Sequence, residues 1–329
     1  MTLTDTQRRS PGSRLLPFVA KYGTLVVLVS MIIGLSIAAP RSFATPDNFL
    51  NILSQISLTA IIAAGLTLPL AVGEFDLSVG YQASLGGVLV VGLITRQGLP
   101  IPVAIGVVVL VGALIGVVNG LVVTKLGVNA LVATLGTGTI VVGLNYAYSG
   151  GIPVAGLDAF PEFTAIAQGK IGGLSNTVLI MAGVLAILWI VLNRTVLGQH
   201  IQAVGGNRHA ARLAGVRVDR VRIAAFAIAG VCAVIAGLLL ASRVGSGQIT
   251  AGDGYLLNSF AAVFLGSAAL RDGEFHILGT FIGVLTVGVG FNGLAILGAP
   301  TFVQFLFSGG LLIMAVALST VARRYAVKR

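Results

Sequence analysis

Long apolar runs, broken by very few charges, follow one another along nearly the whole sequence. Residues 52–72, for instance, contain no Lys, Arg, Asp or Glu. Charged residues make up 9% of the chain, whereas soluble domains carry about 25%. An apolar stretch of about 20 residues crosses the roughly 30 Å hydrocarbon core of a bilayer as a helix. We therefore expect the chain to fold in lipid, because a soluble core of this size cannot hide so much apolar surface.

Helices are the expected form of these runs, because a helix satisfies its own backbone N–H and C=O groups inside lipid. The runs are continuous rather than alternating, and aromatic residues make up only 7% of the chain, which argues against an outer-membrane barrel. The 45 glycines suit helices that pack closely in a membrane. The sequence predicts an all-α polytopic membrane protein of about ten transmembrane helices. The predicted spans are 18–39, 52–72, 78–95, 101–124, 128–148, 174–193, 221–242, 255–270, 276–297 and 301–322.

The basic residues predict the orientation of these spans. Ten spans place both termini on one side, and sixteen of the twenty Lys and Arg residues fall on that side. The positive-inside rule makes it the cytoplasmic side. We expect a multi-pass protein of the bacterial inner membrane, with a cytoplasmic segment 1–17, one transmembrane domain 18–322 and a cytoplasmic tail 323–329. A cleaved signal peptide ending near residues 36–38 is the alternative. Its removal would leave nine spans, and the two ends of the chain would then no longer lie on the same basic side.

The net charge of +10 follows from this topology. Basic residues beside a membrane meet anionic lipid headgroups, which accounts for the charge without another ligand. The predicted spans leave no soluble domain that could present the charge to nucleic acid. We therefore expect the lipid bilayer, and no nucleic acid, as a partner.

The longest predicted cytoplasmic loop, residues 194–220, contains a short helix. Asn207 is a suitable N-cap, the residues that follow it favour a helix, and Gly215 is a natural stop. A helix of about two turns is not stable alone in water, so we expect another protein to pack against it. Leu213 and Val216 are its candidate apolar contacts, within a rim of arginines. A basic loop that only enforces topology is the alternative. The predicted docking helix includes Asn207, Arg208, Ala211, Arg212, Leu213 and Gly215.

Motifs for enzymatic chemistry are missing from the sequence. It holds no G-x-x-x-x-G-K-[ST] loop for binding ATP. The single Cys232 lies in an apolar run, and His200, His209 and His276 do not have the spacing of metal ligands. We expect no enzyme activity, metal or cofactor in the chain itself. A membrane protein with a cytoplasmic docking helix and no ATPase motif suggests a transporter subunit that is driven by a separate nucleotide-hydrolysing protein.

Four stretches, in sequence order, carry a resemblance to a known family. They are GEFDLSVG (73–80), GVVNGLVVTKLGVNALVATLGT (116–137), AVGGNRHAARLAGVRVDRVR (203–222) and FNGLAILG (291–298). Together they resemble permease subunits of ribose-type sugar ABC importers, over nearly the whole chain, and the first and third stretches are the specific ones.

The resemblance implies several partners and a function. It implies a second permease copy, as a homodimer or heterodimer, a cytoplasmic ABC ATPase that binds the ATP, and a periplasmic solute-binding protein. The binding protein delivers a pentose, hexose or related polyol. The resemblance also implies that residues 207–215 are the ATPase coupling helix.

The sequence departs from the sugar pattern in two places. Glu74 stands where the sugar branch usually has Gly, and DGEFH (272–276) replaces a glycine-rich stretch. Both departures add ionisable groups, so a related permease for branched-chain amino acids or nucleosides is an alternative. A further alternative is an ion-coupled secondary transporter that uses Glu74, Asp76 or Glu274 as carriers. The basic loop with its capped helix disfavours the last alternative, and it disfavours a passive channel in the same way.

Polar residues inside the predicted spans are candidates for the solute pathway. Ionisable groups at membrane depth are costly and usually face the bundle interior or a water-filled cavity. A sugar needs carboxylates, amides and hydroxyls as hydrogen-bond partners. The alternative is purely structural. In that case Asp76 caps the next helix, Glu74 points into cytoplasmic water, and the asparagines bond between helices. The candidate pathway residues are Glu74, Asp76, Ser78, Asn119 and Asn292.

Overall fold

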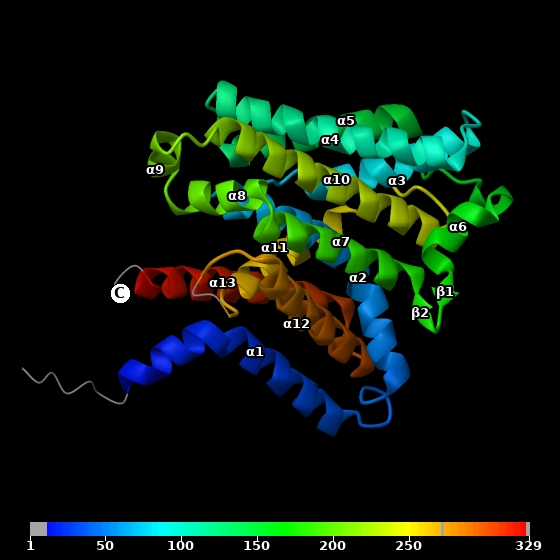
Figure 1. Ribbon diagram of the computed structural model, residues 1–329. Helices are drawn as coiled ribbons and strands as arrows, with labels where there is room; N and C mark the ends of the chain where they lie inside the picture. Colours follow the sequence, from blue (N-terminus) through cyan, green and yellow to red (C-terminus); the bar gives the residue numbers. More distant parts are fainter. Residues whose placement is uncertain (1–11, 271–272, 327–329) are drawn as a thin grey trace, which may run out of the picture.

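The computed structural model describes residues 12–270 and 273–326. Apart from one small hairpin and an isolated bridge between Val154 and Gly247, the regular secondary structure of the described residues is helical (Figure 1). The ten predicted spans correspond to the ten longest described helices. Residues 1–11 of the predicted N-terminal segment, residues 271–272 and residues 327–329 of the predicted tail lie outside the described residues. The long helices are α1 Gly12–Ala38, α2 Pro46–Ala71, α3 Val79–Thr95, α4 Ile101–Lys125, α5 Ala130–Ser149, α7 Asn176–Arg194, α10 Val218–Val244, α11 Asp253–Ser267, α12 Ile277–Ile296 and α13 Thr301–Ala326.

Six of these helices, α2, α4, α5, α7, α10 and α12, are long and apolar enough to cross a membrane. Shorter apolar helices cover part of α1, α3 and part of α13. The predicted span 255–270 corresponds to α11, which has 15 residues and is about 22 Å long at 1.5 Å per residue. The prediction of an all-α polytopic membrane protein is confirmed, with α11 shorter than a full span.

Short elements lie at the two ends of the bundle (Figure 1). At one end α8 (Val196–Gly206) and α9 (Arg208–Leu213) follow α7. At the other end lie the 3-10 turn η1 (Leu157–Ala159), α6 (Pro161–Gln168) and the antiparallel strands β1 (Lys170–Ile171) and β2 (Leu174–Ser175). We call these the α9 end and the α6 end. The start of α1 and the end of α13 both lie at the α9 end (Figure 1), as an even number of crossings requires.

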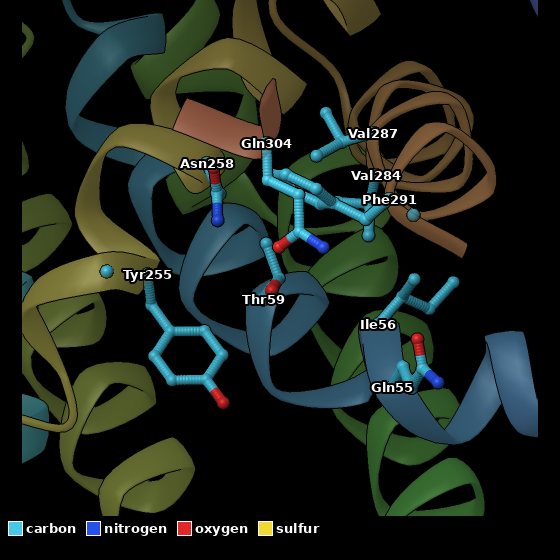
Figure 2. A pocket seen from close by; sticks show the side chains of 11 residues that line it. Gln55, Ile56, Thr59, Tyr255, Asn258, Val284, Val287, Phe291 and Gln304 are labelled. Atoms are coloured by element: carbon cyan, nitrogen blue, oxygen red, sulfur yellow. The ribbon is translucent and has the colours of Figure 1, made fainter. Parts of the chain in front are cut away.

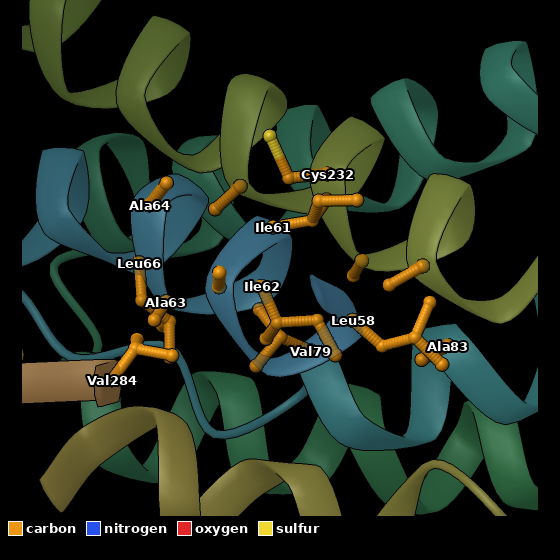
Figure 3. Close-up of a cluster of buried hydrophobic side chains, with 14 of the residues drawn as sticks. Leu58, Ile61, Ile62, Ala63, Ala64, Leu66, Val79, Ala83, Cys232 and Val284 are labelled. Carbon is orange, nitrogen blue, oxygen red and sulfur yellow. The ribbon is translucent and has the colours of Figure 1, made fainter. Parts of the chain in front are cut away.

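Helix α2 forms the centre of the bundle. It is buried without interruption from Ile56 to Leu70 and contacts α7, α8, α10, α11 and α12 (Figure 3). The contact with α10 is close because Gly65 faces Cys232, where an added Cβ would lie 2.6 Å from the cysteine Cβ. Helices in lipid associate through such van der Waals packing of small residues. The glycine-rich composition therefore serves the packing of the core.

Local signals set the ends of α2. Thr45 caps its start by accepting a hydrogen bond from the Asn48 N–H at 3.2 Å, and Pro46 occupies the first turn, where a missing N–H costs nothing. Gly73 follows its end with a φ of +79°, a conformation that glycine adopts without strain. The residues that come next, 74–78, form the turn into α3. This turn lies at the α9 end and holds three of the predicted pathway residues.

Candidate functional site

Helix α9 has the boundaries that its sequence predicts. The Asn207 side chain accepts a hydrogen bond from the Ala210 N–H at 3.0 Å, which caps the first turn. At the other end Gly215 has a φ of +84°, and its N–H donates to the Arg212 carbonyl. The Val216 N–H donates to the Ala211 carbonyl, which completes a Schellman motif. Two local motifs thus hold a helix of only six residues.

The surface of α9 is partly apolar and partly basic. Leu213 is 77% exposed, whereas Ala211 faces inward and is buried. The Arg212 side chain is exposed and lies 3.8 Å from Asp219, which also pairs with Lys125. Val216, the second expected apolar contact, is half-buried and packs against the chain's own core. Leu213 is therefore the apolar side chain of the predicted docking pair that is free to meet another protein.

Glu74 connects α9 to the turn between α2 and α3. One oxygen of Glu74, Oε1, accepts hydrogen bonds from Arg208 and from Arg222, each at 2.6 Å. The Arg208 guanidinium also donates to the carbonyls of Val72 and Gly73, which end α2. Only 8% of the Glu74 side chain is exposed, so it does not point into open water. We call Arg208, Glu74 and Arg222 the ion triad; it fastens α9 to the end of the central helix.

A buried hydrogen-bond network brings three of the predicted pathway residues together. Asp76 Oδ1 accepts from the Ser78 backbone N–H at 2.9 Å and from the Ser78 hydroxyl at 2.5 Å. The same hydroxyl accepts from Asn119 at 2.9 Å and from Gln82 at 2.7 Å. All four residues are fully buried. Gln82 was not among the predicted pathway residues, although its place one helical turn after Ser78 could have indicated it.

The contact between Asp76 and the Ser78 N–H is one that the structural alternative expects. This contact stabilises the start of α3. Within the described residues, one oxygen each of Asp76, Gln82 and Asn119 is buried without a hydrogen-bond partner. Buried polar atoms of this kind are rare because each lost partner costs free energy. The network is therefore the polar centre of the α9 end.

Asn292 lies apart from the other predicted pathway residues. Its side chain exchanges two hydrogen bonds with Asn48, at 3.0 and 2.9 Å, and so joins α12 to the start of α2. Because α2 enters at the α6 end, this pair lies at the opposite end of the bundle from Asp76. His276 likewise holds helices in place: its ring accepts from the Gly279 N–H at 2.7 Å and caps α12.

A cavity of about 320 Å³ lies between α2, α11, α12 and α13 (Figure 2). None of the predicted pathway residues lines it. The polar residues that do are single amides and hydroxyls within apolar helices, so no local sequence signal marks them. The cavity lies in the half of the bundle toward the α6 end, because Gln304 belongs to the first turn of α13 and Phe291 to the second half of α12. The lining residues are Gln55, Ile56, Thr59, Gly254, Tyr255, Asn258, Val284, Val287, Gly288, Phe291 and Gln304.

Residues 48–316 match a protein family described as the permease component of the branched-chain amino acid transport system. The matched region runs from the start of α2 into α13 and contains the ion triad, the buried network and the cavity. The chain belongs to this permease family. The description names a permease component, which agrees with the expectation that the chain is a transport subunit.

Curated relatives of this permease import sugars. The ribose import permease of Bacillus subtilis is 38% identical over 298 residues, which cover 91% of this chain and 92% of that protein. The L-arabinose transport permease of Escherichia coli K12 is 38% identical, and the match covers 90% of this chain and 89% of that protein. The galactose/methyl galactoside import permease of Haemophilus influenzae is 34% identical, and the match covers 94% of this chain and 96% of that protein. These relatives confirm the resemblance to ribose-type importers. No solved structure matches the chain.

Proposed function

We propose that this permease is the membrane subunit of an ATP-driven ABC importer. In the proposed system a periplasmic binding protein delivers a pentose, a hexose or a related polyol, and two permease copies move it across the bacterial inner membrane. The observation that supports an ATP-driven system is α9, a capped helix with an exposed leucine at the end of the bundle where α1 begins and α13 ends. The names of the curated relatives support a sugar as the solute.

Helix α9 is the proposed docking point for the ATPase. An apolar side chain within a polar, charged rim is a common plan for a protein contact, and Leu213 among the arginines fits it. The ATP binds to the partner, so this chain needs no cofactor of its own. Among the described basic side chains the α9 end holds the larger share, namely Lys125, Arg194, Arg208, Arg212, Arg217, Arg220 and Arg222, against Arg41, Arg96, Lys170 and Arg243 at the α6 end. This distribution supports a cytoplasmic α9 end.

The ion triad is the proposed path from the ATPase to the solute. When the ATPase subunits close, they displace α9. Arg208 carries that displacement to the last carbonyls of α2 and to Glu74. Glu74 lies two residues before Asp76, which sets the start of α3. The two copies then rock between outward-open and inward-open states, as transporters with rigid helical halves do.

Reconstitution tests the proposed function. Proteoliposomes hold the permease and the ABC ATPase encoded beside its gene, with the binding protein added outside. We expect uptake of a labelled sugar that requires ATP and all three proteins. Uptake by the permease alone, driven by a proton gradient, would contradict the proposal and favour an ion-coupled transporter. Uptake of leucine in place of sugars would favour the amino-acid branch that the family description names.

The docking surface is tested with a matched pair of variants. Leu213→Asp places a charge at the proposed contact, and Leu126→Asp changes a leucine that is 73% exposed at the same end but outside α9. We expect co-purification of the ATPase to be lost in the first variant and retained in the second. Retention of the ATPase by both variants at the wild-type level would contradict docking at α9.

A further inference from the structure

We propose that the cavity between α2, α11, α12 and α13 binds the transported solute, and that this solute is an uncharged, polyhydroxylated molecule. The inference rests on the proposed function, because it names the solute class and the place where the permease holds it. The cavity is separate from the buried network at the α9 end. Thr59 in the cavity and Val72 beside that network are 13 positions apart on the chain, or about 20 Å along a helix.

The size and the lining of the cavity suit a small polar molecule. Its volume of about 320 Å³ lies at the lower end of the range for small-molecule sites, about 300–1,000 Å³. None of the described residues that line it carries a charge. Five of them offer hydrogen-bonding groups without charge. These are Gln55, Thr59, Tyr255, Asn258 and Gln304.

Three of the polar residues line the same part of the cavity. Figure 2 shows the side-chain amides of Asn258 and Gln304 on the same side of the cavity as Thr59. Ser308 donates to Asn258 Oδ1 at 2.7 Å, which leaves the amide nitrogen to face inward. Amides and hydroxyls both donate and accept hydrogen bonds. The hydroxyl groups of a sugar have the same two capacities, so the match needs no ionised partner.

The apolar part of the lining suits the C–H faces of a sugar ring. Phe291 lines the cavity, and its ring packs edge-on against Phe307, with the ring centres 5.7 Å apart and the planes at 71°. This contact holds the Phe291 ring in place. Val284 and Val287 continue the apolar wall along the same helix. The cavity thus joins an apolar wall from α12 to polar groups from α2, α11 and α13.

Two charged side chains close to the lining residues, Arg243 and Asp253, donate or accept hydrogen bonds outside the cavity. The Arg243 guanidinium donates to the Ser54 carbonyl at 2.9 Å and to the Ser57 hydroxyl at 3.0 Å. Asp253 accepts from Ser84 on α3 at 3.4 Å. A zwitterionic amino acid needs partners for a carboxylate and an ammonium group, because unpaired charges are costly away from water. The cavity supplies neither partner, which favours a sugar over an amino acid.

Thiol labelling tests occupancy of the cavity. The only native cysteine, Cys232, is buried, and Cys232→Ala gives a background without thiols. In that background Gln304→Cys places a thiol in the lining, and Leu297→Cys places a control thiol at the same end, where Leu297 is 54% exposed. A membrane-impermeant thiol reagent is then applied with D-ribose, D-galactose, L-arabinose or leucine.

We expect at least one of the three sugars to slow labelling at position 304, and leucine to leave it unchanged. Labelling at position 297 is expected to be the same in all samples. Protection by leucine and by no sugar would overturn the inference, and so would the absence of any protection at position 304. Equal protection at both positions would overturn it too, because the effect would then not belong to the cavity.

Uptake by the complete complex separates this inference from the proposed function. Asn258→Ala and Thr59→Val each remove a hydrogen-bonding group, so each is expected to slow sugar uptake by about tenfold while the ATPase co-purifies normally. Normal uptake by both variants would overturn the inference and leave the proposed function intact. A wild-type complex without ATP-dependent uptake of any of the three sugars would overturn both.

Discussion

Arg208, on the exposed helix α9, donates a hydrogen bond of 2.6 Å to Glu74, which lies 134 positions earlier in the chain. Glu74 is buried and also accepts from Arg222 at 2.6 Å. One carboxylate therefore joins the proposed docking helix, the turn after α2 and the second turn of α10. The resemblance to sugar permeases implies glycine at position 74, so this ion triad is a feature in which the chain departs from that pattern.

Glu74→Gln is expected to lower the stability of the permease and to weaken the link between α9 and α2. Breaking a buried ion pair costs about 3–5 kcal/mol, and the 44% exposure of Arg208 places the expected loss below that range. The readouts are thermal unfolding in detergent and the amount of sugar imported per ATP hydrolysed. We expect both to fall while the ATPase still co-purifies.

Asp219→Asn is the matched control for that variant. Asp219 also pairs with two basic residues, Lys125 and Arg212, but on an exposed surface. Exposed pairs contribute about 0–1 kcal/mol, so little change in stability is expected. If both variants unfold at the wild-type temperature and import the wild-type amount of sugar per ATP, the ion triad has no role in transmission.

Asn207→Ala is expected to loosen α9 without unfolding the bundle. The variant loses the hydrogen bond to the Ala210 N–H, and removal of an N-cap costs about 0.5–2 kcal/mol. Because α9 has six residues, this loss is large for the helix and small for the protein. Hydrogen exchange of residues 208–214 should speed up, and ATPase binding should weaken. Asn207→Asp, which keeps a cap, should restore both; failure of that rescue would argue against the cap as the cause.

Two variants of the buried network separate a structural role from an ionic one. Ser78→Ala removes the group that accepts from Gln82 and Asn119, so two buried donors lose their partner and stability should fall by about 1–3 kcal/mol for each. Asp76→Asn keeps an oxygen for the Ser78 contacts and should retain most of the stability and the uptake. Complete loss of uptake by a stable Asp76→Asn protein would instead support a carrier role for that carboxylate.

The orientation of the bundle predicts opposite labelling at its two ends. In the Cys232→Ala background, Leu213→Cys is exposed at the α9 end and Leu297→Cys is exposed at the α6 end. A membrane-impermeant thiol reagent added to spheroplasts should modify position 297 at once and position 213 only after the membrane is permeabilised. Labelling of position 213 from outside would place α9 in the periplasm and exclude ATPase docking there.

Several features of the site could be predicted from the sequence because their causes are local. The cap at Asn207 and the stop at Gly215 depend on contacts within a few residues, and these two residue types are the usual choices for such positions. Asp76 and Ser78 are two positions apart, so their contact was among the alternatives. The burial of Glu74 could not be predicted from the sequence, because it depends on Arg208 and Arg222 approaching from distant parts of the chain.

The long apolar runs alone determined that this protein is a bundle of membrane helices, because lipid allows a spanning chain few other forms. The sequence also set where α9 begins and ends. Only the tertiary structure decided that Asn292 pairs with Asn48 and that residues from Gln55 to Gln304 line one partly open cavity. Apolar helices pack by shape over their whole surface, and a single amide in such a helix carries no local signal of which neighbour it will face.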